Sequence, residues 1–241
     1  MKRLFLLISL CVATIALAQT IYVYQDCDKN VQPATSGVLD GHEWVDLGLP
    51  SGTLWATCNV GASTPEENGK YFAWGETSPK SKYSWSTYKY GTAENQLTKY
   101  CTQSNYGKNG FTDNKTVLDA EDDAATANWG NGWRMPTKGE LDELCNNCSS
   151  VWTTQGGKKG RLLAGPNGNT LFLPAAGYYL EGSLYDAGSE GYYWSNSLGG
   201  NPDRAYYLVF DWDDSYTNVI AYNHFNAGRF NGQSVRPVVR R

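Results

Sequence analysis

The sequence has little charge, few histidines and no long apolar run. Charged residues make up 18% of its 241 positions, and His and Met each occur twice. The formal charge is −4, and it becomes −6 without Lys2 and Arg3, because 18 of the 20 basic residues then face 24 acidic ones. This balance argues against binding to nucleic acid or anionic lipid. With 41% hydrophobic and 14% aromatic residues, the chain is also not of the disordered, collagen-like or coiled-coil type.

The one sizeable apolar run, at residues 4–17, follows Lys2 and Arg3 and is shorter than the roughly 20 residues that span a bilayer. Ala16 and Ala18 are small residues at the positions that signal peptidase reads. We therefore predict a signal peptide over residues 1–18, cleaved after Ala18, and a secreted, periplasmic or cell-surface location. Cys11 follows a leucine rather than a small residue, which disfavours lipid attachment. No second apolar stretch reaches spanning length, so we expect no direct membrane insertion after cleavage.

Cysteine is present in an odd number beyond the predicted cleavage site. The five residues are Cys27, Cys58, Cys101, Cys145 and Cys148. At least one must stay unpaired, and spacing alone leaves the connectivity open. Cys145 and Cys148 form a CxxC, but a zinc site needs about four ligands, and His42 and His224 are far away in sequence. A redox pair would stand at the start of a helix, whereas this one falls near a predicted helix end. We interpret both as structural and predict no metal and no cofactor.

The 26 Gly and 9 Pro residues favour short elements over a helix bundle. We predict one helix over residues 117–128, with acidic residues in its early turns. A second begins after Pro136, where Thr137 and Glu140 form a capping box and Leu141, Leu144, Cys145 and Cys148 share one face. Strand-like pieces follow at residues 169–179, 190–198, 205–212, 217–222 and 233–239.

A family resemblance covers most of the chain beyond the signal peptide. The segments EWVDLGLPSGTLWATCNVGA, YFAWGE, GWRMPTKGEL, LFLPAAGYY and SVRPV resemble the Fibrobacter-major-paralogue (FISUMP) domain of exported bacterial proteins. GWRMPTKGEL is also similar to a stretch of formylglycine-generating enzymes, whose fold is a variant of the C-type lectin fold. The resemblance implies an α+β, C-type-lectin-like domain, with two helices packed on short, mostly antiparallel irregular sheets and long loops. We expect this domain at residues 41–241, preceded by an extended segment or linker at residues 19–40.

Catalysis and calcium binding are not favoured by the motifs. Formylglycine generation would need a reactive cysteine pair near the C-terminus, and no cysteine follows Cys148. Trp-Ser-Asn at 194–196 and Asn-Pro-Asp at 201–203 depart from the calcium-binding motifs of C-type lectins. Residues 211–215 begin like an EF-hand loop, but Tyr216 and Tyr222 stand where Gly and Glu are needed. We expect the protein not to be an enzyme.

An acidic run at Asp119, Glu121, Asp122 and Asp123 allows two interpretations. Its carboxylates could bind a hard cation, or they could form a solvated face at a helix N-terminus. We favour the solvated face.

Residues 192–241 contain no Lys, Glu or Met but many Tyr, Asn, Asp and Phe. Tyr offers contact area at low entropic cost, and Asn and Asp offer adaptable hydrogen bonds. We therefore predict that the C-terminal loops bind a protein or glycan ligand at a surface. The predicted contacts are Trp212, Asp213, Asp214, Tyr216, Asn218, Tyr222, Asn223, His224, Phe225, Asn226 and Phe230.

The same composition suits a C-terminal stretch diversified by a retroelement, in which adenines of AAY asparagine codons are randomised. Such codons never yield Lys, Glu, Gln, Met or Trp, so Trp194, Trp212 and Gln233 would be fixed and the other predicted contacts variable. An ordinary FISUMP domain whose aromatic end closes the sheet is the competing interpretation.

A further alternative is a structural or adhesive component of a bacterial cell-surface assembly, in which residues 19–40, with strand-like Ile21–Val23, add as a strand.

We divide the aromatic residues into two groups. The first, predicted to be core, is Trp44, Trp55, Trp74, Trp129, Trp133 and Trp194. The second, predicted to be surface offered to a partner, is much of the Tyr and Phe content after residue 205, which alternates with the core-like pieces AYYLVF at residues 205–210 and SVRPVV at residues 234–239.

Overall fold

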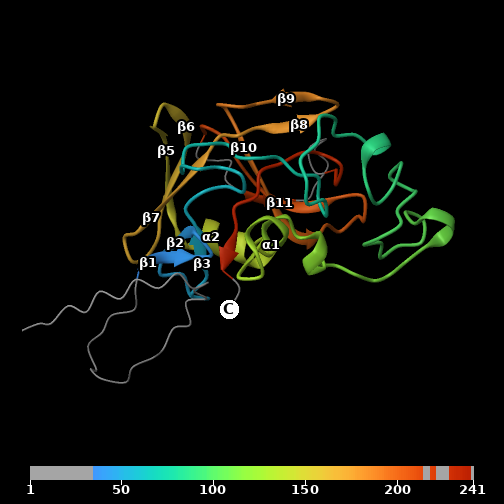
Figure 1. The fold of residues 1–241 in the computed structure, drawn as a ribbon, viewed down its shortest axis with the longest axis horizontal. Helices are drawn as coiled ribbons and strands as arrows, with labels where there is room; N and C mark the ends of the chain where they lie inside the picture. Colours follow the sequence, from blue (N-terminus) through green and yellow to red (C-terminus); the bar gives the residue numbers. More distant parts are fainter. Residues whose placement is uncertain (1–34, 214–217, 221–227, 240–241) are drawn as a thin grey trace, which may run out of the picture. The chain divides into compact units, whose positions relative to one another are not determined.

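A computed structural model gives the structure of the chain and describes residues 35–213, 218–220 and 228–239. The described part consists mainly of β-strands and long loops with two α-helices (Figure 1), which places it in the α+β or mostly-β class. The predicted signal peptide and most of the predicted linker lie outside the described residues. Among the described helices, none has the length and apolar character needed to cross a membrane.

A five-stranded antiparallel sheet brings distant parts of the sequence together. Its order is β1 (Ser36–Leu39), β2 (His42–Asp46), β3 (Leu54–Ala56), β13 (Val238–Val239) and β4 (Trp133–Arg134). β1 and β2 form a hairpin whose turn residues Asp40 and Gly41 have φ of 49° and 81°. The boundary predicted between residues 40 and 41 falls within this turn, so β1 belongs to the sheet.

This sheet has a hydrophobic core on each face because neighbouring residues of a strand point to opposite sides. Trp44 pairs with Ala56 and faces the first core, whereas Val45 pairs with Trp55 and faces the second. The helix α1 (Ala124–Trp129) contributes to the first core, and α2 (Lys138–Asn147) to the second. The prediction that six tryptophans are core is confirmed, since each is at most 8% exposed.

The second predicted helix is confirmed together with its capping box. The Thr137 hydroxyl accepts from the Glu140 amide at 3.1 Å, and the Glu140 carboxylate accepts from the Thr137 amide at 2.8 Å. Leu141 and Leu144 are buried in the second core, with Cys145 and Cys148 packed against it.

The first predicted helix is wrong in its first half. Val117 pairs with Ser197, and the Leu118 amide donates to the Asn196 carbonyl at 3.0 Å, so this segment runs extended along another strand. A single 3₁₀ turn, η3 (Ala120–Asp122), follows. The Asp123 carboxylate then caps α1 by accepting from Ala125 and Thr126. The acidic residues that we predicted for the first turns of one helix are therefore divided between two elements. Glu121 and Asp122 lie in η3, and Asp123 caps α1.

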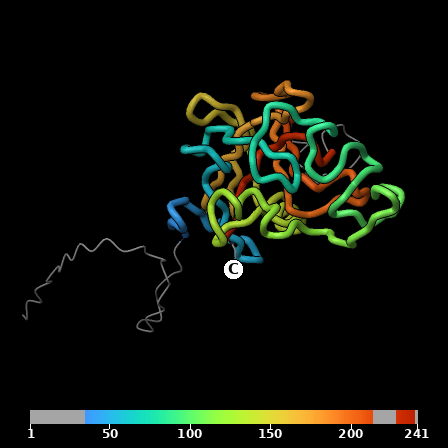
Figure 2. The backbone as a smooth tube through the Cα atoms, turned by 45° about the vertical axis from the view of Figure 1, so that its right-hand side comes forward, coloured from blue at the N-terminus to red at the C-terminus, as the bar shows by residue number. Residues whose placement is uncertain are grey.

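Three further antiparallel sheets complete the fold. One consists of β5 (Ser149–Gln155), β6 (Lys158–Ala164) and β7 (Thr170–Pro174), another of β10 (Gly191–Leu198), β11 (Ala205–Phe210) and β12 (Asn218–Ile220), and the smallest of β8 (Tyr178–Leu180) and β9 (Ser183–Tyr185). Two short 3₁₀ turns, η1 (Trp85–Thr87) and η2 (Lys108–Gly110), lie in the long loops between β3 and α1 (Figure 2). The strands from β7 onward overlap the strand-like pieces predicted from the sequence, except β9, which was not predicted.

The prediction that AYYLVF at residues 205–210 is a core-like piece is confirmed in β11. Tyr207 is 0% and Phe210 1% exposed. β11 is the central strand of its sheet, with Tyr207 in the first core and Phe210 in the second. A strand covered on both faces buries its aromatic residues whichever way they point.

Candidate binding surface at the ends of strand β11

Few of the predicted ligand contacts fall on described side chains. Trp212, Asp213 and Phe230 are described, and Asn218 is described only as the first residue of β12. Outside the described residues lie Asp214, Tyr216, Tyr222, Asn223, His224, Phe225 and Asn226.

The structure places Trp212 and Phe230 at opposite ends of β11. Trp212 follows the last strand residue, Phe210, whereas Phe230 lies just beyond Gly228, which pairs with Arg204 immediately before the strand. Five steps of about 3.4 Å separate the ends of β11 by about 17 Å. These two predicted contacts are therefore not brought together.

At the Trp212 end an indole projects from a fixed turn. Trp212 is 67% exposed, the highest value among the large apolar side chains that are described. The Asp213 amide donates to the Asp211 carboxylate at 2.8 Å, which closes the turn around Trp212. An exposed aromatic side chain on an ordered backbone can contact a ligand with little loss of conformational entropy.

Arg161 holds the root of this turn. Its Nε and Nη2 donate to the Asp211 carbonyl at 3.1 and 2.9 Å, and its Nη1 donates to the Ser150 hydroxyl at 3.2 Å. Arg161 is only 1% exposed, so removing its guanidinium would strand these acceptors in the interior. No sequence motif singles out Arg161, because the acceptor of two of its bonds is a main-chain carbonyl.

At the other end Phe230 is half-buried. Its ring lies 4.8 Å from that of Trp85, and both residues pack against the first core. Phe230 therefore has a packing role, which the prediction of a ligand contact did not include.

Arg229 holds the root at this end and is 0% exposed. Its Nη1 donates to the Tyr100 and Pro202 carbonyls at 2.9 and 2.8 Å, and its Nη2 donates to the Lys99 carbonyl at 3.0 Å. The guanidinium carbon also lies 5.0 Å from the centre of the Trp74 ring, a cation–π contact. Each end of β11 is thus fixed by a fully buried arginine that binds main-chain oxygen atoms.

The acidic run lies near the Arg229 end and forms only in part the solvated face at a helix N-terminus that we favoured: the Glu121 side chain is 71% exposed and Asp123 caps α1, but two of the four residues are buried. Asp122 and Asp123 are 1% and 3% exposed. Lys99 places its Nζ 2.6 Å from Asp122, 2.8 Å from Asp119 and 3.6 Å from Glu121. An ammonium group of the chain itself therefore stands among the three carboxylates where a hard cation would bind.

Asp122 is held in its charged form. It accepts hydrogen bonds from Tyr90 and from Tyr100, the latter at 2.7 Å, and pairs with Lys89 at 3.1 Å. Burial raises the pKa of this carboxyl, but hydrogen bonds from Lys99, Tyr90, Tyr100 and Lys89 outweigh burial and lower it to about 2. The cluster ties the loop around residue 100 to the start of α1.

The remaining described side chains that could take part in catalysis, the thiols of Cys145 and Cys148 and the His42 ring, are packed against other residues. Burial raises the pKa of the Cys145 thiol to about 12 and that of Cys148 to about 11. The His42 ring stacks on Trp129 at 3.7 Å, and partial burial lowers its pKa despite the nearby Asp40. His224, the second histidine of the chain, lies outside the described residues.

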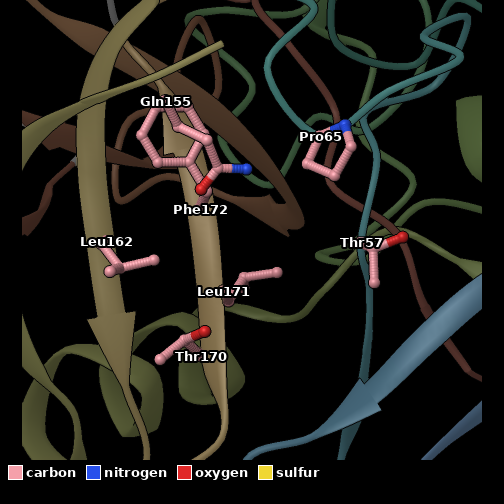
Figure 3. Close-up of a pocket in the computed structure, with 7 residues that line it drawn as sticks. All are labelled: Thr57, Pro65, Gln155, Leu162, Thr170, Leu171 and Phe172. Atoms are coloured by element: carbon pink, nitrogen blue, oxygen red, sulfur yellow. The ribbon is translucent and has the colours of Figure 1, made fainter.

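A small hollow of about 320 Å³ opens beside the sheet formed by β5, β6 and β7 (Figure 3). Leu162, Leu171 and Phe172 of the sheet face Thr57 and Pro65 of the opposite segment across it. The lining also includes Gln155 and Thr170 and contains no charged side chain.

Comparisons of the chain with protein-family models, with curated proteins and with solved structures found no match.

Proposed function

We propose that the protein is an exported, non-catalytic binding module that recognises a protein or glycan ligand through the Trp212 turn. The observation that carries the proposal is the 67% exposed indole on a turn that the buried Arg161 fixes from below. Tryptophan is among the residues that contribute most to binding when they enter a partner's pocket, and its amphipathic ring suits both protein and sugar surfaces. Asp213 beside it is also exposed.

The fold we propose is C-type-lectin-like, within the FISUMP family. Support comes from two helices that pack on short antiparallel sheets with long loops between them, as the resemblance implies. A shared fold does not determine a ligand, so the functional argument depends on the Trp212 turn.

The absence of catalysis is part of the proposal. Its support is the state of the described nucleophiles and bases. The thiols of Cys145 and Cys148 have raised pKa values, and His42 has its ring stacked on Trp129. Cysteine catalysis needs a thiolate of low pKa, and a Ser–His or Cys–His mechanism needs a histidine within reach of the nucleophile.

Diversification of the C-terminal loops by a retroelement is a further part of the proposal. Trp194 and Gln233, two of the positions that such a mechanism would leave fixed, are both 0% exposed, as scaffold residues should be. Trp212, the third, is exposed and would be a constant anchor among variable neighbours. A near-copy of the last coding stretch downstream, differing only at adenines, is expected. Its absence would eliminate this part of the proposal.

The binding proposal is tested by probing the purified protein against a glycan array and an array of surface proteins. Trp212→Ala should weaken the best ligand by at least about tenfold, as for a central anchor residue. Tyr185→Ala, at a 43% exposed aromatic residue on β9, is the matched control and should bind as the wild type does. Equal binding by wild type and Trp212→Ala would overturn the proposal.

A further inference from the structure

β5 is an edge strand without the features that usually protect such edges. It forms seven consecutive pairs with β6, from Ser149–Ala164 to Gln155–Lys158, with no bulge. Its sequence, SSVWTTQ, contains no charge and no proline. Natural sheets normally protect an exposed edge with lysine, proline, a bulge or a covering segment, because unpaired backbone groups are a template for another strand.

The other edge of the same sheet is covered. On β7 the Phe172 carbonyl accepts from Nη2 of the buried Arg236 at 3.1 Å. Among the described residues, no backbone hydrogen bond joins β5 to any element except β6. Val151, in the middle of β5, is 55% exposed.

The pairing pattern identifies which β5 backbone groups point outward. The Lys159 carbonyl accepts from the Ala175 amide at 2.9 Å, so the Lys159 backbone faces away from β5. Its partner Thr154 therefore points its own amide and carbonyl away from β6. Since this direction alternates along a strand, Ser150, Trp152 and Thr154 present the unpaired donors and acceptors.

We propose that β5 pairs antiparallel with β5 of a second copy of the chain, which joins two three-stranded sheets into one of six strands. The strand is self-complementary about a two-fold axis at Trp152. Ser150 then exchanges hydrogen bonds with Thr154 of the other copy, and the two Trp152 residues face each other. Val151 lies opposite Thr153, a β-branched pair that stabilises antiparallel strands. Because β5 carries no charge, two-fold pairing places no like charges opposite each other along the strand.

The other described edge strands are less suited to this pairing. β9 and β12 have three residues each, β4 has two, and β1 has four. The edges of β10 and β8 are already bonded, since the Trp194 amide donates to the Ser234 carbonyl at 3.0 Å and the Tyr179 amide to the Gly232 carbonyl at 2.8 Å. A seven-residue strand pair alone covers less than the roughly 1,200–2,000 Å² of a standard stable interface, so the dimer is reversible. Because Arg161 links Ser150 to Asp211, the dimer carries two Trp212 turns, one beside each β5.

The test uses protein expressed from the full 241-residue sequence and analytical ultracentrifugation over a wide concentration range. Wild-type protein is expected to show a reversible monomer–dimer equilibrium. Thr154→Pro removes one outward amide at an exposed position without removing a bond to β6. Val151→Lys sets two lysines on one face about 7–8 Å apart in the dimer. Each substitution should weaken association at least about tenfold.

Leu184→Lys is the matched control, since Leu184 is 40% exposed on β9, and it should dimerise as the wild type does. Circular dichroism shows whether each variant keeps its fold. Amide exchange of Trp152 and Thr154 in the wild type gives a readout that needs no substitution, because both amides should exchange more slowly as concentration rises. A wild type that stays monomeric, or one that dimerises without slowing these two amides, would overturn the proposal.

Discussion

The two ends of β11 are held in the same way by a buried arginine but differ in the exposure of the aromatic side chain found there. Arg161 at one end and Arg229 at the other are both buried and both bind main-chain carbonyls. Trp212 nevertheless extends into solvent, whereas Phe230 packs against Trp85. The comparison teaches that an aromatic, Asn-rich and Asp-rich sequence does not by itself make a binding surface. Packing of the neighbouring loop decides which aromatic residue remains available to a partner.

The largest loss of stability is expected when either of the two buried arginines, Arg161 or Arg229, is replaced. Arg229→Met leaves three carbonyls and the Tyr88 hydroxyl without their buried donor, and should lower the free energy of unfolding by about 3–5 kcal/mol. Arg161→Met strands one carbonyl and one hydroxyl and should cost about 2–3 kcal/mol. Urea unfolding measures both. A larger loss for Arg161→Met would reverse the expected order.

The Asp122 cluster makes the Arg229 end sensitive to acid. The folded pKa of Asp122 is about 2, below the ordinary value of 3.8, so its contribution is complete above the ordinary value and is lost as pH falls through about 2. Asp122→Asn should lower the free energy of unfolding by about 2–3 kcal/mol near neutral pH. It should also flatten the acid limb of the stability curve, as measured by urea unfolding at a series of pH values. An unchanged acid limb would show that Asp122 does not control it.

The aromatic side chains at the two ends, Phe230 and Trp212, should differ in their contribution to the free energy of unfolding. Phe230→Ala removes a half-buried ring from its contact with Trp85 and should cost about 1–2 kcal/mol in unfolding free energy. Trp212→Ala removes an exposed side chain and should change stability by less than about 0.5 kcal/mol, while weakening ligand binding by at least about tenfold. Thermal melts of the two variants side by side give the comparison. Equal destabilisation would mean that Trp212 is part of the core.

The smallest effect is expected from a histidine away from both ends. Burial lowers the pKa of His42 below 6.5, so the unfolded chain takes up its proton first and stability decreases as pH falls below that ordinary value. His42→Phe keeps an aromatic ring on Trp129 and should remove this shallow decrease between about pH 7 and pH 5. Melting temperatures over that range test it, and an identical slope in both proteins would assign the decrease to another group.

The parts of the fold that could be predicted from sequence depend on local chemistry. The capping box of Thr137 and Glu140 marked the start of α2, and the aromatic residues of the family-like segments marked the core. The β5–β6 hairpin was also readable, because Gly156-Gly157 between Thr-rich and Lys-rich runs is a two-residue turn signal, but it was missed.

The rest depended on contacts between distant residues. Asp122 is buried because Lys99, Tyr90 and Tyr100 converge on it from another loop. No local sequence pattern predicts these contacts. Tyr207 and Phe210 belong to a piece that was predicted to be core-like, but composition does not show that β11 is the central strand of its sheet. For the candidate site, Trp212 was included correctly as an exposed position, whereas the separation of Trp212 from Phe230 required the strand pairing.

The way in which the two root arginines are satisfied has a consequence for the evolution of the chain. Arg229 and Arg161 bind the carbonyls of Lys99, Tyr100, Pro202 and Asp211, and every amino acid provides a carbonyl. The bonds to the arginines therefore place no demand on the side chains of those four positions, whereas the side chains of Lys99 and Tyr100 are constrained separately by Asp122, and that of Asp211 by the Asp213 amide. Pairs of this kind leave no correlated substitutions in related sequences, so methods that read contacts from covariation would not detect the bonds that hold both loops in place.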